Sequence, residues 1–253
     1  EQVEQCWDAL GRVVPVEETV MPAVYVNSAA ILKAFCGEHG GLTCTSSNAR
    51  KVIEWSWARR EKILFFPDEH LGRNTANKMG IPREQMIVWD PFMPRGGNSV
   101  EAIKRAKLIL WKGHCSVHQM FQPSHVDYFR KQYPDVKVIV HPECHEDVVN
   151  KADLVGSTEY IIRTITAAPA GTTWAVGTEL NLVNRLKHEQ TDKKVFFLSS
   201  TVCQCATMYR IDAPHLCWAL ENLADGHVVN RIIVPDDEKQ WAKVALDRMM
   251  ALS

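Results

Sequence analysis

Short apolar segments alternate with amphipathic segments along almost the whole chain. The apolar runs have strand length and predict strands at Ala23–Val26, Leu42–Thr45, Ile63–Phe66, Met86–Trp89, Lys107–Trp111, Val136–Val140, Leu154–Gly156, Thr173–Gly177, Val195–Leu198 and Val228–Val234. The segments between them predict helices at Ala29–His39, Ala49–Arg60, Arg73–Met79, Val100–Ala106, His125–Gln132, Glu146–Lys151, Glu159–Ala167, Leu180–His188, Ala213–Leu223 and Glu238–Leu252. Near-continuous apolar strands separated by helices are typical of parallel sheets with helices on both faces. The sequence therefore predicts an α/β fold of three-layer α/β/α domains.

The same order of landmarks occurs twice, which indicates an internal duplication. The first run is VYVNS (24–28), CTSSN (44–48), ILFFPDEH (63–70) and LILWKGHCS (108–116), and the second is VIVHPE (138–143), VGSTE (155–159), WAVGTE (174–179) and VFFLSSTVCQC (195–205). Each run consists of three strand, turn and helix units followed by a strand that leads to a cysteine. The positions that correspond are Tyr25 with His141, Ser46 with Ser157, Asp68 with Thr178, and Cys115 with Cys205.

The duplication predicts where a functional site would lie. In open α/β sheets, ligands bind beyond the carboxyl ends of the strands, and the polar clusters follow strand ends. If these ends face each other, Cys115 and Cys205 converge on one cleft. A third repeat upstream would supply a third cysteine and leave one iron of a cuboidal cluster without a protein ligand. Because the first residues, EQVEQCWDAL, have the pattern of a helix and include no initiator Met, we expect further sequence upstream.

Several segments resemble bacterial quinolinate synthases, the quinolinate synthetase A family. They are YVNSAA, CTSSNA, KILFFPDEHLGRNTA, LWKGHCSVHQ, VIVHPEC, GSTEYII, WAVGTE and CATMYRID, from Ala23 to the C-terminus. The combination of GHCSVH, HPE with GST, and CATM, in that order, is specific. The resemblance implies three α/β domains in pseudo-threefold arrangement around a [4Fe–4S] cluster, with two complete here. It assigns residues 1–21 to a remnant of the first domain, 22–120 to the second, 121–212 to the third, and 213–253 to a helix–strand–helix segment that packs back on the first.

The resemblance also implies a function. The family condenses iminoaspartate with dihydroxyacetone phosphate to quinolinate, with loss of phosphate and water, in de novo NAD biosynthesis. The enzyme would be a transferase of the dehydratase type that uses an iron of the [4Fe–4S] cluster as Lewis acid. An L-aspartate oxidase or dehydrogenase is the implied partner that supplies iminoaspartate.

Site residues carry over from the family motifs position by position. The resemblance makes Cys115 and Cys205 cluster ligands, and it places substrate contacts at Tyr25, Asn27, Ser46, His141, Glu143 and Thr158. Among these, it assigns catalytic roles to Glu143, His141 and Tyr25. The first family cysteine and its early His and Ser contacts would fall before Glu1. Cys6 lies in an amphipathic helical stretch and is not assigned as a ligand, so we expect two of three cluster ligands in this chain.

Simpler interpretations of the same residues remain open at this point. His114 and His118, on either side of Cys115, could form a zinc site with Cys203 and Cys205, since zinc takes four such ligands. Ser46, Ser157 and Thr158 could be plain helix N-caps, and Glu143 could cap the next helix. We expect Asp68, Glu69, His70 and Arg73 to form ion pairs between domains, Cys144 to be structural, and Cys6, Cys36, Cys44 and Cys217 to be small buried hydrophobes. The alternative functions are an iron–sulfur oxygen sensor and a non-catalytic truncated fragment.

Charge and hydropathy narrow the classes of partner. The formal net charge is −1, so no global basic field predicts nucleic-acid binding. No apolar run approaches the roughly 18–20 residues that cross a bilayer, and the acidic N-terminal residues do not resemble a signal peptide. Eight cysteines in such a chain favour metal or redox chemistry over a disulfide framework. We therefore predict a cytoplasmic protein without nucleic-acid or membrane partners.

Overall fold

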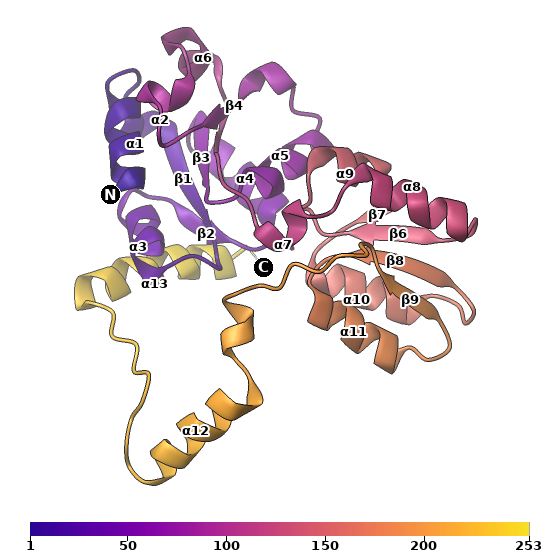
Figure 1. The fold of residues 1–253 in the computed structure, drawn as a ribbon. Helices are drawn as coiled ribbons and strands as arrows, with labels where there is room; N and C mark the ends of the chain where they lie inside the picture. The colour runs from indigo at the N-terminus through magenta and orange to yellow at the C-terminus, as the bar shows by residue number, and fades with distance from the viewer. Residues whose placement is uncertain (253) are drawn as a thin grey trace.

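The computed structural model describes residues 1–252 and contains two α/β lobes and a C-terminal arm (Figure 1). The first lobe, residues 2–111, holds the strands β1 Val20–Tyr25, β2 Leu42–Cys44, β3 Lys62–Phe66, β4 Met86–Trp89 and β5 Leu108–Trp111. Its helices are α1 Gln2–Gly11, α2 Val16–Thr19, α3 Ala30–Glu38, α4 Ala49–Trp57, α5 Glu69–Lys78, η1 Arg83–Gln85, η2 Pro94–Gly97 and α6 Val100–Arg105.

The second lobe, residues 123–197, repeats this pattern on a smaller scale. Its strands are β6 Lys137–Val140, β7 Leu154–Val155, β8 Thr173–Gly177 and β9 Lys194–Phe197, and its helices are α8 Pro123–Gln132, α9 Glu146–Lys151, α10 Thr158–Ala167 and α11 Leu180–Glu189. Helix α7, Ser116–Gln119, lies on the connection between the lobes. After β9 the chain forms η3 Met208–Arg210, α12 Ala213–Ala224 and α13 Asp236–Met250.

Both sheets are parallel throughout and have the same strand order. The first sheet runs β2-β1-β3-β5-β4 and the second β7-β6-β8-β9. Strands β1, β2, β3 and β5 thus correspond to β6, β7, β8 and β9, with β4 added at the far edge of the first sheet. The predicted α/β fold is therefore confirmed, and the shared order agrees with the duplication inferred from the landmarks.

Each sheet buries both of its faces, because successive side chains of a strand point in opposite directions. In the first lobe, Val24 and Leu64 contact the core under α1 and α3, while Ala23 and Phe65 contact the core under α4 and α5. In the second lobe, Val138 and Val140 pack with α8 and α9, whereas Ile139 packs with α10 and α11. This two-sided burial explains why the strands are almost wholly apolar.

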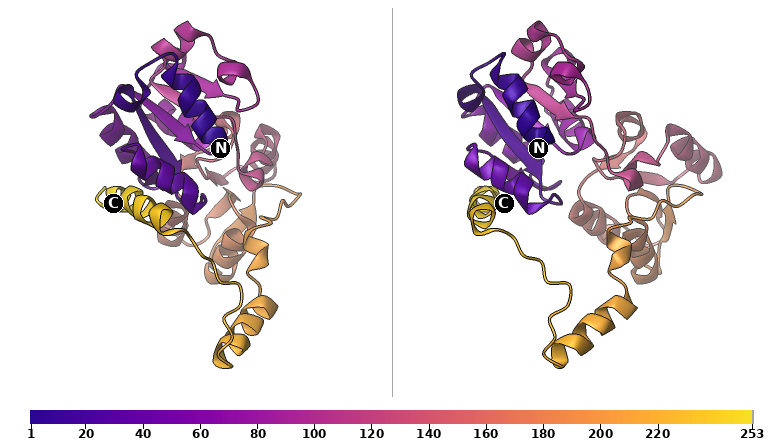
Figure 2. Two further views of the ribbon diagram at one scale, coloured as in Figure 1. Left: turned by 90° about the vertical axis from the view of Figure 1, so that its left-hand side faces the viewer. Right: turned by 60° about the vertical axis from the view of Figure 1, so that its left-hand side comes forward.

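The C-terminal arm leaves the second lobe and returns to the first. Figure 2 shows α12 projecting away from both lobes, and α13 lying against α3. The return is closely fitted: a Cβ atom on Gly37 of α3 would lie 2.0 Å from the Trp241 carbonyl oxygen, so only glycine is accommodated. Arg248 Nη1 donates hydrogen bonds to the carbonyls of Gly37 and Gly41 at 3.2 and 2.6 Å. The chain therefore crosses between the lobes twice, once after β5 and once after β9.

Two predictions for the arm are wrong. Residues 228–234 form no strand but an irregular segment, because Val228, Ile232 and Ile233 are exposed and belong to neither of the two sheets in the described part of the chain. Cys217 was expected to be buried, and it is exposed on α12, a helix without a single buried residue among those described. Within residues 1–252, no helix combines the length and the apolar character needed to cross a membrane.

Candidate functional site

The strand ends of both lobes open onto one cavity of about 410 Å³. Tyr25 ends β1, Cys115 follows β5, and His141 and Glu143 follow β6. The residues that line the cavity include Tyr25, Asn27, Cys115, His118, His141, Glu143, Thr158, Thr178 and Cys205. The predicted convergence of Cys115 and Cys205 is therefore present, and we call this space the central cavity.

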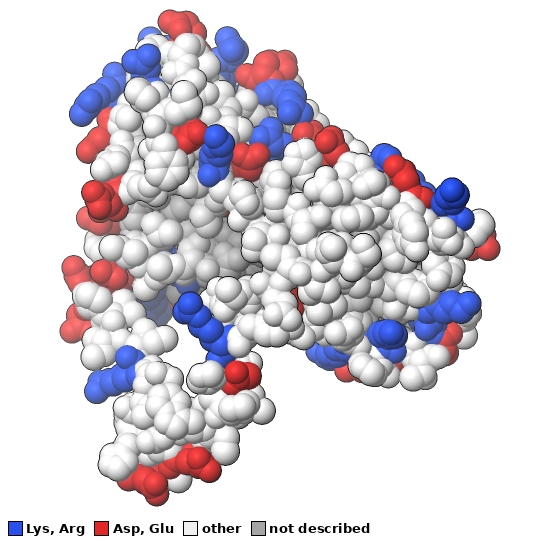
Figure 3. Space-filling model, in the orientation of Figure 1, with Lys and Arg blue, Asp and Glu red and all other residues white. Residues whose placement is uncertain are grey.

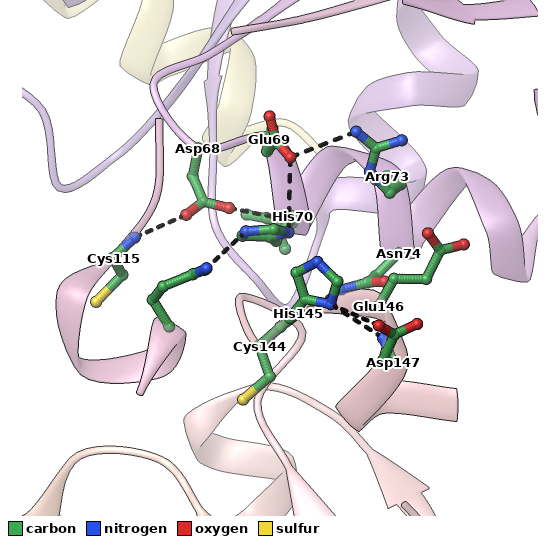
Figure 4. Close-up of polar contacts among 12 residues, drawn as sticks. Asp68, Glu69, His70, Arg73, Asn74, Cys115, Cys144, His145, Glu146 and Asp147 are labelled. Atoms are coloured by element: carbon green, nitrogen blue, oxygen red, sulfur yellow. Dashed lines mark hydrogen bonds and ion pairs between the residues drawn. The ribbon is translucent and has the colours of Figure 1, made fainter. Parts of the chain in front are cut away.

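Cys115 is held at the N-terminus of α7 by a carboxylate from the neighbouring strand end. Its backbone N–H donates to Asp68 Oδ2 at 3.1 Å (Figure 4). Asp68 Oδ1 accepts from Leu71 N at 2.8 Å and so caps α5. Burial and the nearby Glu143 charge raise the pKa of Asp68 to about 7. Burial likewise raises the pKa of the Cys115 thiol to about 11. Without a metal, this sulfur is therefore a neutral thiol at the cavity wall.

A buried imidazole and carboxylate cluster lies beside Cys115. Glu143 Oε2 is 3.2 Å from His141 Nδ1 and 3.4 Å from His118 Nδ1, and the two rings stack with centroids 4.6 Å apart. Burial and the adjacent His141 lower the pKa of His118 to about 3, so this ring is neutral. Burial alone would raise the pKa of Glu143, but the interaction with His141 and the nearby imidazoles of His118 and His70 together outweigh burial, so the pKa is lowered and the carboxylate stays ionised.

This cluster offers ligands that suit a metal ion. One ligand atom each from Cys115, His118 and Glu143 lies within 4.8 Å of the other two. His118 Nε2 contacts Thr178 Oγ1 at 3.3 Å. His118 Nδ1 is buried and, although it lies 3.4 Å from Glu143 Oε2, forms no hydrogen bond within residues 1–252. The zinc site suggested by the sequence differs from this set, because His114 and Cys203 do not line the central cavity.

Tyr25, Asn27 and Thr158 bring polar groups to the cavity wall from both lobes. Burial raises the pKa of Tyr25, and the Glu143 charge adds to the effect. The phenol therefore stays protonated and can donate a hydrogen bond. Thr158 is the first residue of α10, where backbone N–H groups favour anions.

Ser46 is the predicted site residue that does not line the central cavity. It lies on a second cavity with Ser157, although its side chain is near enough to Tyr25 to oppose the rise in the pKa of that phenol. Of the suggested caps, Ser157 caps α10 by accepting from Tyr160 N at 3.3 Å. Helix α9 is capped by His145, so Glu143 is free of a capping role.

The charged run after β3 forms local contacts. The ion pair of Glu69 with Arg73 is 3.4 Å long and lies within α5, which corrects the expected pairing between domains, because residues four apart share one helix face. His70 Nε2 contacts Gln119 Oε1 of α7 at 3.0 Å. Cys144 is buried with its thiol 3.6 Å from the Gly177 carbonyl, as expected of a structural residue.

Sequence reasoning missed two residues of the site. His118 entered only as a zinc ligand, although its position three residues after Cys115 places both on one side of a helical turn. Thr178 was matched with Asp68 in the duplication but received no role, and it now proves to contact His118.

Comparisons with known proteins agree with these observations. The profile of the family described as Quinolinate synthetase A protein matches residues 1–251. The chain is 57% identical over 252 residues to a quinolinate synthase of Rhodopirellula baltica, covering 99% of this chain and 64% of that protein. It is 56% identical over 253 residues to a quinolinate synthase of Acidobacterium capsulatum, covering 99% and 68%. The chain therefore spans about two thirds of the length of these relatives.

Proposed function

Because the chain belongs to the quinolinate synthetase A family, we propose that it forms the catalytic core of a quinolinate synthase. The reaction joins iminoaspartate and dihydroxyacetone phosphate and releases phosphate and two molecules of water, in the route to NAD. The observation that carries the proposal is the meeting of Cys115 and Cys205 with Glu143, His141 and Tyr25 in the central cavity.

The donor set of the central cavity fits an iron–sulfur cluster. Thiolates are the ligands of such clusters, and two cysteines from different lobes face one space. Cys115 is partly exposed there rather than sealed in a core. We propose that Cys115 and Cys205 hold a [4Fe–4S] cluster, with a further ligand from the part of the relatives that this chain does not match. When bound, the cluster supplies a Lewis acid that assists loss of water.

The protein side chains would provide the proton transfers of the reaction. Carbon–carbon bond formation requires removal of a proton, and Glu143 is ionised and therefore able to accept one. Loss of water requires a donor to the departing oxygen, and the protonated phenol of Tyr25 can serve. His141 lies 3.2 Å from Glu143 and can hold this carboxylate or receive its proton.

Substrate orientation would come from groups that recognise anions and polar atoms. Thr158 and the first-turn N–H groups of α10 suit a substrate carboxylate. Asn27 offers both a donor and an acceptor, and Ser46 acts on the site through Tyr25. On the face of the molecule drawn in Figure 3, basic and acidic side chains are interspersed around the edge. Recognition of an anionic substrate is therefore assigned to Thr158, Asn27 and the first-turn N–H groups of α10 rather than to the overall surface charge.

The test compares two neighbouring carboxylates in the chain joined to the unmatched part of the Rhodopirellula relative. We expect Glu143→Gln to reduce quinolinate formation by about 100-fold or more, the usual contribution of a general base, while bound iron stays unchanged. Glu146→Gln is the matched control, because Glu146 pairs with Arg83 outside the central cavity. Equal activity of both variants would refute the proposed role of Glu143.

The same protein separates the two alternatives. An oxygen sensor would bind iron, and Glu143→Gln would leave its response unaltered. A non-catalytic fragment would bind no iron after anaerobic reconstitution. Full iron content together with quinolinate formation supports the enzyme.

A further inference from the structure

The turn that carries Glu143 is bonded to the opposite lobe through one side chain. Asn74 belongs to α5 of the first lobe and is 1% exposed. Its Nδ2 donates hydrogen bonds to the carbonyl of Pro142 and to the carbonyl of Cys144, both at 2.8 Å. The amide nitrogen of an Asn side chain carries two N–H groups. Both are therefore used on the two residues that flank Glu143 in the sequence.

The second lobe holds the same turn through its N–H groups. Cys144 N donates to the His141 carbonyl at 3.0 Å, which closes the turn, and His141 N donates to the Gly177 carbonyl of β8 at 2.9 Å. Glu143 N donates to His141 Nδ1 at 3.3 Å. The N–H groups of the turn are thus bonded within the second lobe, whereas two of its carbonyls are bonded by the first. The position of Glu143 therefore depends on both lobes.

Helix α5 also holds a cysteine of the central cavity. Asp68 occupies the N-cap position of this helix and accepts a hydrogen bond from Cys115 N at 3.1 Å. Asn74 lies further along the same helix. Because an α-helix has a fixed rise per residue, the spacing between Asp68 and Asn74 is fixed. A single helix therefore places the backbone of Cys115 and the turn of Glu143 relative to one another.

We propose that Asn74 is a positioning residue, which fixes the Glu143 carboxylate relative to Cys115 across the boundary between the lobes. The inference rests on the proposed role of Glu143 as proton acceptor. A reacting group that is displaced by about 1 Å can lose about 100-fold in rate. Asn74 Oδ1 is buried without a hydrogen-bond partner within residues 1–252, which offsets part of the stability that the two Nδ2 bonds contribute. We therefore assign these bonds to placement of the turn rather than to net stability.

Asn77 provides a matched control on the same helix. Its Nδ2 also donates to the second lobe, at 2.8 Å, but the acceptor is Glu146 Oε1 of α9. The experiment measures steady-state quinolinate formation by the chain joined to the unmatched part of the Rhodopirellula relative. We expect Asn74→Ala to lower kcat about 10- to 100-fold, with KM and bound iron within about twofold of the parent protein. Asn77→Ala should lower kcat by less than about twofold, and equal losses in the two variants would overturn the inference.

A double-mutant cycle separates positioning from a general structural effect. If Asn74 acts through Glu143, adding Asn74→Ala to Glu143→Gln should lower the remaining rate by less than about twofold. The same loss as in the parent protein would show a merely structural role and overturn the inference. Full activity of Glu143→Gln would refute the proposed function and this inference together. Low activity of Glu143→Gln with full activity of Asn74→Ala would refute the positioning role alone.

Hydrogen–deuterium exchange of the turn gives a readout that does not depend on activity. We expect the N–H groups of Glu143 and Cys144 to exchange at least about threefold faster in Asn74→Ala, because the bonds that hold the turn are lost. Asn77→Ala should leave these two rates unchanged. Asn74→Ser, whose hydroxyl keeps one donor, should show a smaller change in the same direction and serves if Asn74→Ala does not fold. Unchanged exchange in the Asn74 variants would overturn the inference.

Discussion

The two lobes each present a cysteine at the same step of their strand order, but they hold it differently. The backbone of Cys115 is bonded to Asp68, and α7 begins directly after it. Cys205 lies in a stretch whose neighbours Gln204, Ala206 and Thr207 are exposed, and within residues 1–252 its carbonyl accepts a local hydrogen bond from Tyr209 N. The topology of the sheet thus determines where a ligand residue emerges, while contacts from neighbouring strand ends determine how firmly it is held.

The largest expected effect concerns Asp68, which accepts a hydrogen bond from the backbone N–H of Cys115. The pKa of Asp68 is raised to about 7, whereas an unfolded Asp titrates near 4. A carboxyl with a raised pKa in the folded state stabilises the fold at low pH, and this stability is lost as pH rises from about 4 to about 7. In the metal-free chain, we expect the free energy of unfolding to fall over this pH range by at most about 4 kcal/mol more than it falls in the Asp68→Asn variant. Urea unfolding of both proteins across this range measures it, and parallel pH profiles would contradict it.

Cys115 and Cys205 should both be metal ligands, although the segments that carry them are held differently. After anaerobic reconstitution of the chain joined to the unmatched part of its relative, Cys115→Ser and Cys205→Ser should each lower bound iron by about tenfold or more. Cys203→Ser is the matched control for the second loop and should retain the iron. If Cys203→Ser lost iron and Cys205→Ser kept it, the ligand assignment would pass to Cys203.

Limited proteolysis compares how readily the segments around Cys115 and Cys205 open locally. Arg210 follows Cys205 in an exposed segment, whereas Lys112 precedes Cys115 and its N–H bonds the Trp89 carbonyl at 2.9 Å. Because cleavage requires local opening, trypsin should cut after Arg210 at least about fivefold faster than after Lys112. Mass spectrometry of early fragments measures both rates, and preferential cleavage at Lys112 would reverse the comparison.

The smallest effect is expected beyond the second loop, on α12. Trp218 is 44% exposed and no residue of this helix is buried. We expect Trp218→Ala to change the free energy of unfolding of the chain by less than about 0.5 kcal/mol. Chemical denaturation measures this change, and a loss above about 1 kcal/mol would show that α12 packs on the lobes in solution.

The sequence predicted the lobes well because each strand is buried on both faces and is therefore almost wholly apolar. It failed for Val228–Val234, since β-branched residues raise strand propensity but cannot supply a sheet edge for pairing. The convergence of Cys115 and Cys205 on one cavity was predictable because both follow strand ends. The contact of His118 with Thr178 was not found, since it joins two lobes whose packing no local pattern encodes.

The double crossing between the lobes has a consequence for how they move. Cys115 lies on the outward crossing after β5, and Cys205 lies on the return crossing that ends in α13. A ligand bonded to both sulfurs would therefore link the two segments that connect the lobes. Opening of the lobes and release of that ligand then become one linked equilibrium, so each must weaken or strengthen the other by the same factor.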